Sequence, residues 1–339
     1  MIAMRIVILL LVVLFIDSAS SADSDSIETV KRQSKSFVRE IRSIEFASVN
    51  VGEDENRESK EKVSRKETMR YFQSGNMFRS ETGITLNGES LGDEILTYTG
   101  ERFQAFYKDE GTMDLKDSSM FTNPSRVPSP LVLAFSFLAK RDMAYSWTEI
   151  TSEKNIEDTF KQAKYIGNGE YNGDECLILQ FPGVVSGFTN EVWFSQEHGY
   201  FPVKLVVSAN NSNIGVQEVK KLHEVTLDDS TRIFIPIEIV STFNYPGGSV
   251  YSSSTSTTTI DTDTIKINHE IDADFFTLPT TIARQVNDID QMIAEGTLLV
   301  QDNDNIEPRS ISTAMISWII VSIVIIILII YRIYLTKFK

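Results

Sequence analysis

Two uncharged apolar runs near the ends of the chain restrict where a folded domain can lie. The first, residues 6–16, follows Arg5 and precedes small residues that end at Ala22. A charged start, a short apolar centre and a small-residue cleavage region are typical of a secretory signal peptide. We therefore predict that residues 1–22 are a signal peptide, cleaved after Ala22.

The second run, residues 314–331, has eighteen residues and no charge. As a helix it is about 27 Å long, close to the roughly 30 Å of a bilayer's hydrocarbon core. The tail, residues 332–339, is basic and stays on the cytoplasmic side of a membrane. The sequence therefore predicts a single-pass integral membrane protein with an exported domain over residues 23–284 and a polar linker over residues 285–313.

The acidic net charge of the chain limits the classes of partner that it can bind. The formal net charge is −15, and because the tail carries +3 and the signal peptide zero, the exported part carries −18. Nucleic-acid binding needs Lys and Arg to displace counterions from phosphates, so nucleic acid is excluded as a partner. Broad adhesion to anionic lipid surfaces is disfavoured for the same reason.

No catalytic or metal-binding signature emerges. The three histidines, His198, His223 and His269, lack zinc-ligand spacing, and the single cysteine excludes a Cys/His cluster. Cys176 follows two acidic residues, which favours a small buried group over a reactive thiol. Ser186 does not lie in a Gly-x-Ser-x-Gly elbow. We therefore predict no enzyme activity, no metal and no cofactor.

The order of elements predicts an α+β domain. Residues 27–44 have apolar side chains at helical spacing, with a basic face that either is solvated or contacts lipid headgroups or an acidic partner. From Ile44 to Ile267 the apolar period is mostly two, with frequent turn signals, which predicts antiparallel hairpins. Residues 131–140 predict a short buried helix, and the Ser/Thr-rich residues 249–259 a strand with a polar face rather than a glycosylated stalk.

Three segments resemble the LolA/LolB-like family of outer-membrane lipoprotein-sorting proteins. Residues 165–179 are similar to its Asn-Gly hairpin, residues 191–205 to its tryptophan strand and Pro-Val return strand, and residues 272–279 to its closing phrase. The resemblance spans residues 27–279. It implies a curved antiparallel half-barrel with a long N-terminal helix and a short buried lid helix, in the periplasm of a bacterial envelope. A membrane tether, however, disfavours shuttling lipoproteins between membranes.

An apolar half-barrel of this kind can bind a lipid or acyl group. Burying a fourteen-carbon chain gains on the order of 10 kcal/mol before ordering costs. The residues that we predict to line the cavity are Phe103, Phe106, Leu131, Phe135, Leu138, Trp147, Leu179 and Trp193. The alternative is an extracytoplasmic protein-interaction or sensor module that acts through a membrane or envelope protein partner.

Overall fold

The computed structural model describes residues 24–117, 134–138, 151–183, 187–210, 212–244 and 251–295. Contacts divide the chain into two units, residues 1–290 and residues 291–339. The predicted signal peptide and the predicted membrane helix over residues 314–331 both lie outside the described residues. Within the ranges given above, no helix is both long enough and apolar enough to cross a membrane.

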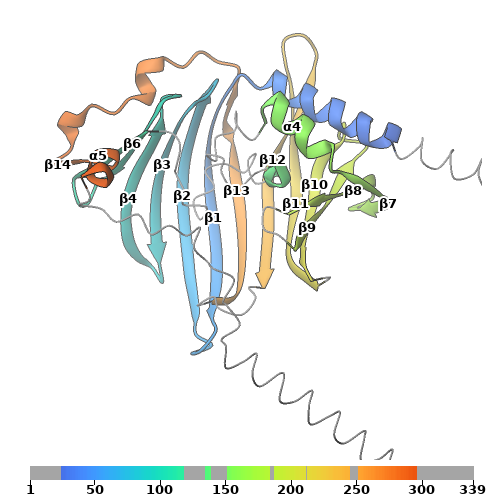
Figure 1. The fold of residues 1–339 in the computed structure, drawn as a ribbon, viewed down its shortest axis with the longest axis horizontal. Helices are drawn as coiled ribbons and strands as arrows, with labels where there is room; N and C mark the ends of the chain where they lie inside the picture. The colour runs from blue at the N-terminus through green and yellow to red at the C-terminus, as the bar shows by residue number, and fades with distance from the viewer. Residues whose placement is uncertain are drawn as a thin grey trace, which may run out of the picture. The chain divides into compact units, whose positions relative to one another are not determined.

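The first unit is built on one curved sheet (Figure 1), whose described strands number fourteen, in the order β14-β6-β5-β4-β3-β2-β1-β13-β12-β11-β10-β9-β8-β7. The first run of strands comprises β1 (Ser43–Asn56), β2 (Lys62–Ser74), β3 (Met77–Leu86), β4 (Glu89–Tyr98), β5 (Arg102–Tyr107) and β6 (Thr112–Asp117). The second comprises β7 (Lys164–Tyr171), β8 (Asp174–Pro182), β9 (Phe188–Ser195), β10 (Phe201–Ala209), β11 (Ser212–Thr226), β12 (Arg232–Asn244) and β13 (Tyr251–Ile267). The predicted curved antiparallel sheet is confirmed.

Each run is an antiparallel meander, and the pairing of β1 with β13 joins the two meanders into one sheet. The short strand β14 (Gln285–Asp288), within the predicted linker, extends the sheet by pairing in parallel with β6. The Ser/Thr-rich strand β13 lies between β1 and β12, as a central strand. The predicted strand in that segment is therefore confirmed.

Alternating side chains give the sheet two distinct faces. Along β1, Ile44, Phe46 and Ser48 are buried, whereas Val49 and Val51 are exposed. We call the face that holds Ile44 and Phe46 the inner face and the opposite one the outer face. The main hydrophobic core lies on the inner face, which agrees with a sheet covered by helices on one side.

Helical segments cover the inner face. The N-terminal helix (residues 24–40) contributes Val30 to the main core and lies beside α4 (Glu153–Phe160) (Figure 1). The helix ends before the predicted Ile44, because the Asn268 side chain accepts a hydrogen bond from the backbone N–H of Arg42 and donates one to the Glu40 carbonyl. In the described part of the predicted lid helix, residues 134–138, Ala134 is α-helical, Phe135 is in a turn and the 3-10 helix η2 (Ser136–Leu138) follows.

A smaller core lies on the outer face of β4, β5 and β6. Ile95, Phe106, Met113, Leu115 and Leu278 form it. Leu278 belongs to the segment between the 3-10 helices η3 (Ala273–Phe276) and η4 (Thr280–Ile282), which precedes β14 and the short helix α5 (Ile289–Ala294). Residues 272–279, the closing segment, therefore cover the outer face at one end of the sheet.

Candidate functional site

Six of the eight predicted ligand-binding residues lie among the described residues, and four of these share one location. Phe103, Phe135, Leu138 and Leu179 all belong to the main core, and none is more than 2% exposed. Each packs within this cluster of buried hydrophobic side chains. Leu131 and Trp147 fall outside the described residues.

Phe106 and Trp193 lie on the opposite face of the sheet from these four, although Trp193 also packs against the edge of the main core. Phe106 belongs to the smaller core on the outer face. Trp193 lies between Val192 and Phe194, which both face the main core, so its ring points to the outer face. There its Nε1 donates a hydrogen bond to Glu191 at 2.8 Å, and Lys204 Nζ lies 5.0 Å from its ring centroid. These two residues do not line the same space as the other four.

Residues 134–138, which we call the plug, fill the inside of the curved sheet with aromatic rings. Phe135 stacks on Phe37 of the N-terminal helix with ring centroids 5.4 Å apart. Phe137 lies 4.9 Å from Phe181 by the same measure. The side-chain contacts of the plug are thus largely apolar.

A buried amide side chain of α4 anchors the plug. Asn155, only 2% exposed, donates a hydrogen bond from its Nδ2 to the backbone oxygen of Leu138 at 2.7 Å. The Ser152 side chain caps α4 by accepting a hydrogen bond from the Asn155 backbone at 3.3 Å. Helix α4 was not among the elements predicted from the sequence, although Ser152 followed by Ile156 and Phe160 carries the cap and the i, i+4 apolar pair of a short helix.

The basic face of the N-terminal helix is paired with α4. Lys31 lies 3.4 Å from Glu157, Arg39 lies 2.9 Å from Glu153, and Lys35 contacts both glutamates. The hydrogen bond between Lys35 and Glu157 lowers the pKa of Glu157 and raises that of Lys35. For Lys31 and Lys35, whose side chains are 17% exposed, these pairs correct the expectation of a solvated face, because the acidic groups that they contact belong to α4 of the same chain.

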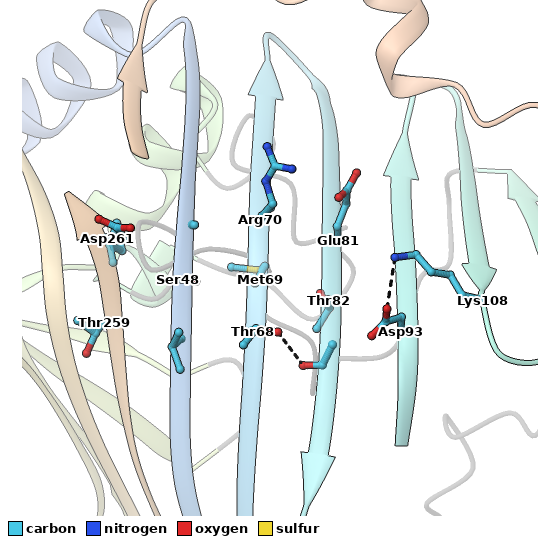
Figure 2. Close-up of a pocket in the computed structure, with 14 residues that line it drawn as sticks. Ser48, Thr68, Met69, Arg70, Glu81, Thr82, Asp93, Lys108, Thr259 and Asp261 are labelled. Carbon is cyan, nitrogen blue, oxygen red and sulfur yellow. Dashed lines mark hydrogen bonds and ion pairs between the residues drawn. The ribbon is translucent and has the colours of Figure 1, made fainter. Parts of the chain in front are cut away.

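The outer face carries a groove of about 660 Å³ that crosses β13, β1, β2, β3 and β4 (Figure 2). Small residues form its floor: a side chain at Gly83 would begin 3.0 Å from an Asp93 oxygen and 3.1 Å from the Thr68 hydroxyl. Lys108, 3.4 Å from Asp93, and Arg70 lie at its rim (Figure 2). None of the predicted residues lines this groove, which sequence reasoning missed because its lining comes from five strands.

A Ser-His-Asp cluster closes the turn between β9 and β10 without forming a catalytic triad. His198 Nδ1 lies 2.9 Å from Ser195 Oγ and 3.0 Å from Asp174 Oδ2. In a triad the serine and the aspartate contact different ring nitrogens. Beside this cluster, Cys176 is buried as predicted, and burial raises the pKa of its thiol to about 11. Over the described ranges, no three His, Cys, Asp or Glu side chains are placed to hold a metal ion.

Comparison with known proteins gives likenesses of fold only. No protein-family model and no curated protein matches the chain. A DUF1329 family protein from Desulfovibrio piger is 10% identical with a TM-score of 0.42, over 75% of this chain and 96% of that one. An outer membrane lipoprotein-sorting protein domain from Vibrio parahaemolyticus is 13% identical with a TM-score of 0.36, over 69% and 88%. The Mycobacterium tuberculosis lipoprotein LppX is 12% identical with a TM-score of 0.29, over 74% and 100%.

The solved structures that are similar in fold thus include a protein of the lipoprotein-sorting class, the class that the sequence motifs resemble. Because the TM-scores lie below 0.5, these likenesses carry no argument about function.

Proposed function

We propose that this chain is a non-enzymatic, membrane-anchored protein of the bacterial envelope that binds a lipid or acyl group against the inner face of its sheet. The observation that supports the proposal most is the plug. Four of its side chains, Ala134, Phe135, Phe137 and Leu138, are at most 4% exposed. They occupy the inside of the sheet through apolar contacts that an acyl chain could replace.

Energetics make such an exchange feasible. A fourteen-carbon chain gains on the order of 10 kcal/mol from burial. Moving the plug to water costs about 1.5–3 kcal/mol for each of its large apolar side chains, and about 1 kcal/mol for the Asn155 hydrogen bond. The free energy gained by burying the acyl chain and the free energy lost by exposing the plug are thus of similar size. A long acyl chain therefore competes with the plug, whereas a short one does not.

The direct test is photo-crosslinking of the full-length chain, held in amphipol, with a palmitate that carries a diazirine. Crosslinked peptides are mapped by mass spectrometry, which separates the domain from the predicted membrane helix. The proposal expects adducts at residues that surround the plug, such as Phe37 and Phe181. Adducts confined to residues 314–331 would contradict it.

A matched pair of variants sharpens this test. Asn155→Ala removes the hydrogen bond to Leu138 and should raise the yield of adducts, by about fivefold if one net hydrogen bond is lost. Ser152→Ala weakens the cap of the same helix but leaves that hydrogen bond in place, so its yield should stay near wild type. Equal yields from both variants would show that release of the plug does not control binding.

The outer groove supports a second candidate, a protein-interaction module. Val49, 37% exposed, lines the groove, and Val51, 51% exposed, follows it on the same face of β1. A photo-crosslinking residue at Val49 in intact membranes should give a discrete protein adduct, whereas one at Leu91, an exposed control outside the groove, should not. Equal labelling from both positions would remove this candidate.

A further inference from the structure

The inner face changes from apolar to polar along the central strands. On β1, Ile44 and Phe46 belong to the main core, and the next residues of the same face are Ser48 and Asn50. On β13, Ile260 belongs to the core, and the same face continues away from it with hydroxyl side chains. We call the resulting set the polar band; it consists of Ser48, Asn50, Arg65, Ser254, Ser256 and Thr258.

Strand register brings the members of the band together. Asn50 pairs with Thr258, and Gly52 pairs with Ser256 on β13 and with Arg65 on β2. Directly paired residues share a face, with Cβ atoms about 5 Å apart. Gly52 keeps the middle of the band open, since a Cβ atom there would lie 3.1 Å from that of Ser256.

The band holds buried polar atoms without partners. Both the Asn50 Oδ1 and the Arg65 Nε atoms are buried, and within the part of the chain that the structure describes neither has a hydrogen-bond partner. Ser48, Ser254 and Thr258 are each at most 9% exposed. Buried polar atoms in proteins are almost always hydrogen-bonded, so unsatisfied atoms grouped on one face point to a bound polar group.

Charge selects the kind of group. Glu67 pairs with Asn50 and therefore faces the band beside Arg65, and Asp54 pairs with Ser254. Among the described residues, Arg65, Glu67 and Asp54 together carry a net charge of −1, which disfavours an anionic headgroup. A hydroxyl group of a ligand can both donate and accept a hydrogen bond. A ligand with several hydroxyl groups therefore matches a band whose side chains include donors, acceptors and hydroxyls.

We infer that the polar band binds a neutral, polyhydroxylated headgroup, such as a sugar, of the lipid whose acyl chain lies against the apolar part of the inner face. This inference rests on the proposed function and names its ligand class: a glycolipid. It also gives the Ser/Thr-rich sequence of β13 a role that the sheet alone does not require.

The test is competition against the diazirine palmitate adduct on the full-length chain, with three competitors of equal acyl composition: a monoglycosyl diacylglycerol, a diacylglycerol and a phosphatidylglycerol. The glycolipid is expected to compete at the lowest concentration. Equal competition by all three overturns the headgroup site and leaves acyl binding intact. Absence of any palmitate adduct in the domain refutes the proposed function instead.

Neighbouring threonines of β13 supply the matched variants. Thr258→Val keeps the side-chain shape but removes a hydroxyl of the band, and should weaken competition by the glycolipid about fivefold without changing that of diacylglycerol. Thr257→Val makes the same change on the outer face and should alter neither. Ser256→Ala is the second band variant, read only if its thermal unfolding matches wild type. Equal effects of Thr257→Val and Thr258→Val overturn the inference.

Discussion

Gln104 and Leu278 bind each other through two hydrogen bonds although 174 positions separate them. The Gln104 Nε2 donates to the Leu278 carbonyl at 3.0 Å, and its Oε1 accepts from the Leu278 backbone N–H at 2.7 Å. One buried amide thus satisfies both backbone groups of a residue that has no strand partner. This relationship holds the closing segment on the outer face of β5.

Gln104→Ala should therefore lower the stability of the domain strongly. It leaves the buried N–H and C=O of Leu278 unsatisfied, which costs about 2–4 kcal/mol in free energy of unfolding. Urea unfolding followed by tryptophan fluorescence measures the loss. Gln285→Ala, at an exposed position of β14, is the control and should change stability by less than about 0.5 kcal/mol. A loss of that small size in Gln104→Ala would show that the closing segment contributes little.

Asn268 joins the end of the N-terminal helix to the end of β13, and its two roles can be separated. Its side chain binds the backbone of Glu40 and Arg42, and its own backbone is left-handed, with φ of 56°. Asn268→Gly removes the side-chain bonds but tolerates this φ, whereas Asn268→Ala adds strain of about 1–2 kcal/mol. The alanine variant should thus be the less stable of the two in thermal unfolding. The reverse order would mean that the left-handed backbone is not retained.

Local patterns predicted the strands because the information lies within short segments. The hairpin of β7 and β8 is an example: alternating residues flank Asn172-Gly173, both of which adopt positive φ, as a tight hairpin turn requires. The pairing of β1 with β13 could not be predicted in the same way. It depends on contacts between residues more than 200 positions apart, such as Ile44 and Ile267.

For the predicted site residues, what the sequence leaves open is mainly the direction of each side chain. Phe103 and Phe106 lie three residues apart on one strand, so the period of two already places them on opposite faces. Trp193 is different, because its orientation relative to Leu179 follows from the register in which Leu179 pairs with Val192. That register is a property of the folded sheet and cannot be predicted from the sequence of either strand alone.

The ion pairs between the N-terminal helix and α4 predict a pH window for their contact. The pKa of Glu157 is lowered, so its contribution is present above the ordinary value of 4.5 and is lost as pH falls through the lower folded value. The pKa of Lys35 is raised, so its contribution is lost as pH rises through a value above 10.5. Glu157→Gln should thus lose less melting temperature than wild type on acidification. If the melting temperatures of Glu157→Gln and wild type fell in parallel as pH is lowered, the ion pair would not contribute in this way.

Cys176 should react with alkylating reagents only when the domain opens. Its side chain is fully buried and the pKa of its thiol is raised to about 11, so little thiolate forms at about pH 8, where a free cysteine near its ordinary value of 9 reacts readily. Mass spectrometry should find the native chain unlabelled by iodoacetamide and the urea-unfolded chain fully labelled. Because the chain has a single cysteine, the labelling rate reports opening of the β8–β9 region directly. Rapid, stoichiometric labelling of the native chain would instead show that this part of the sheet opens often under native conditions.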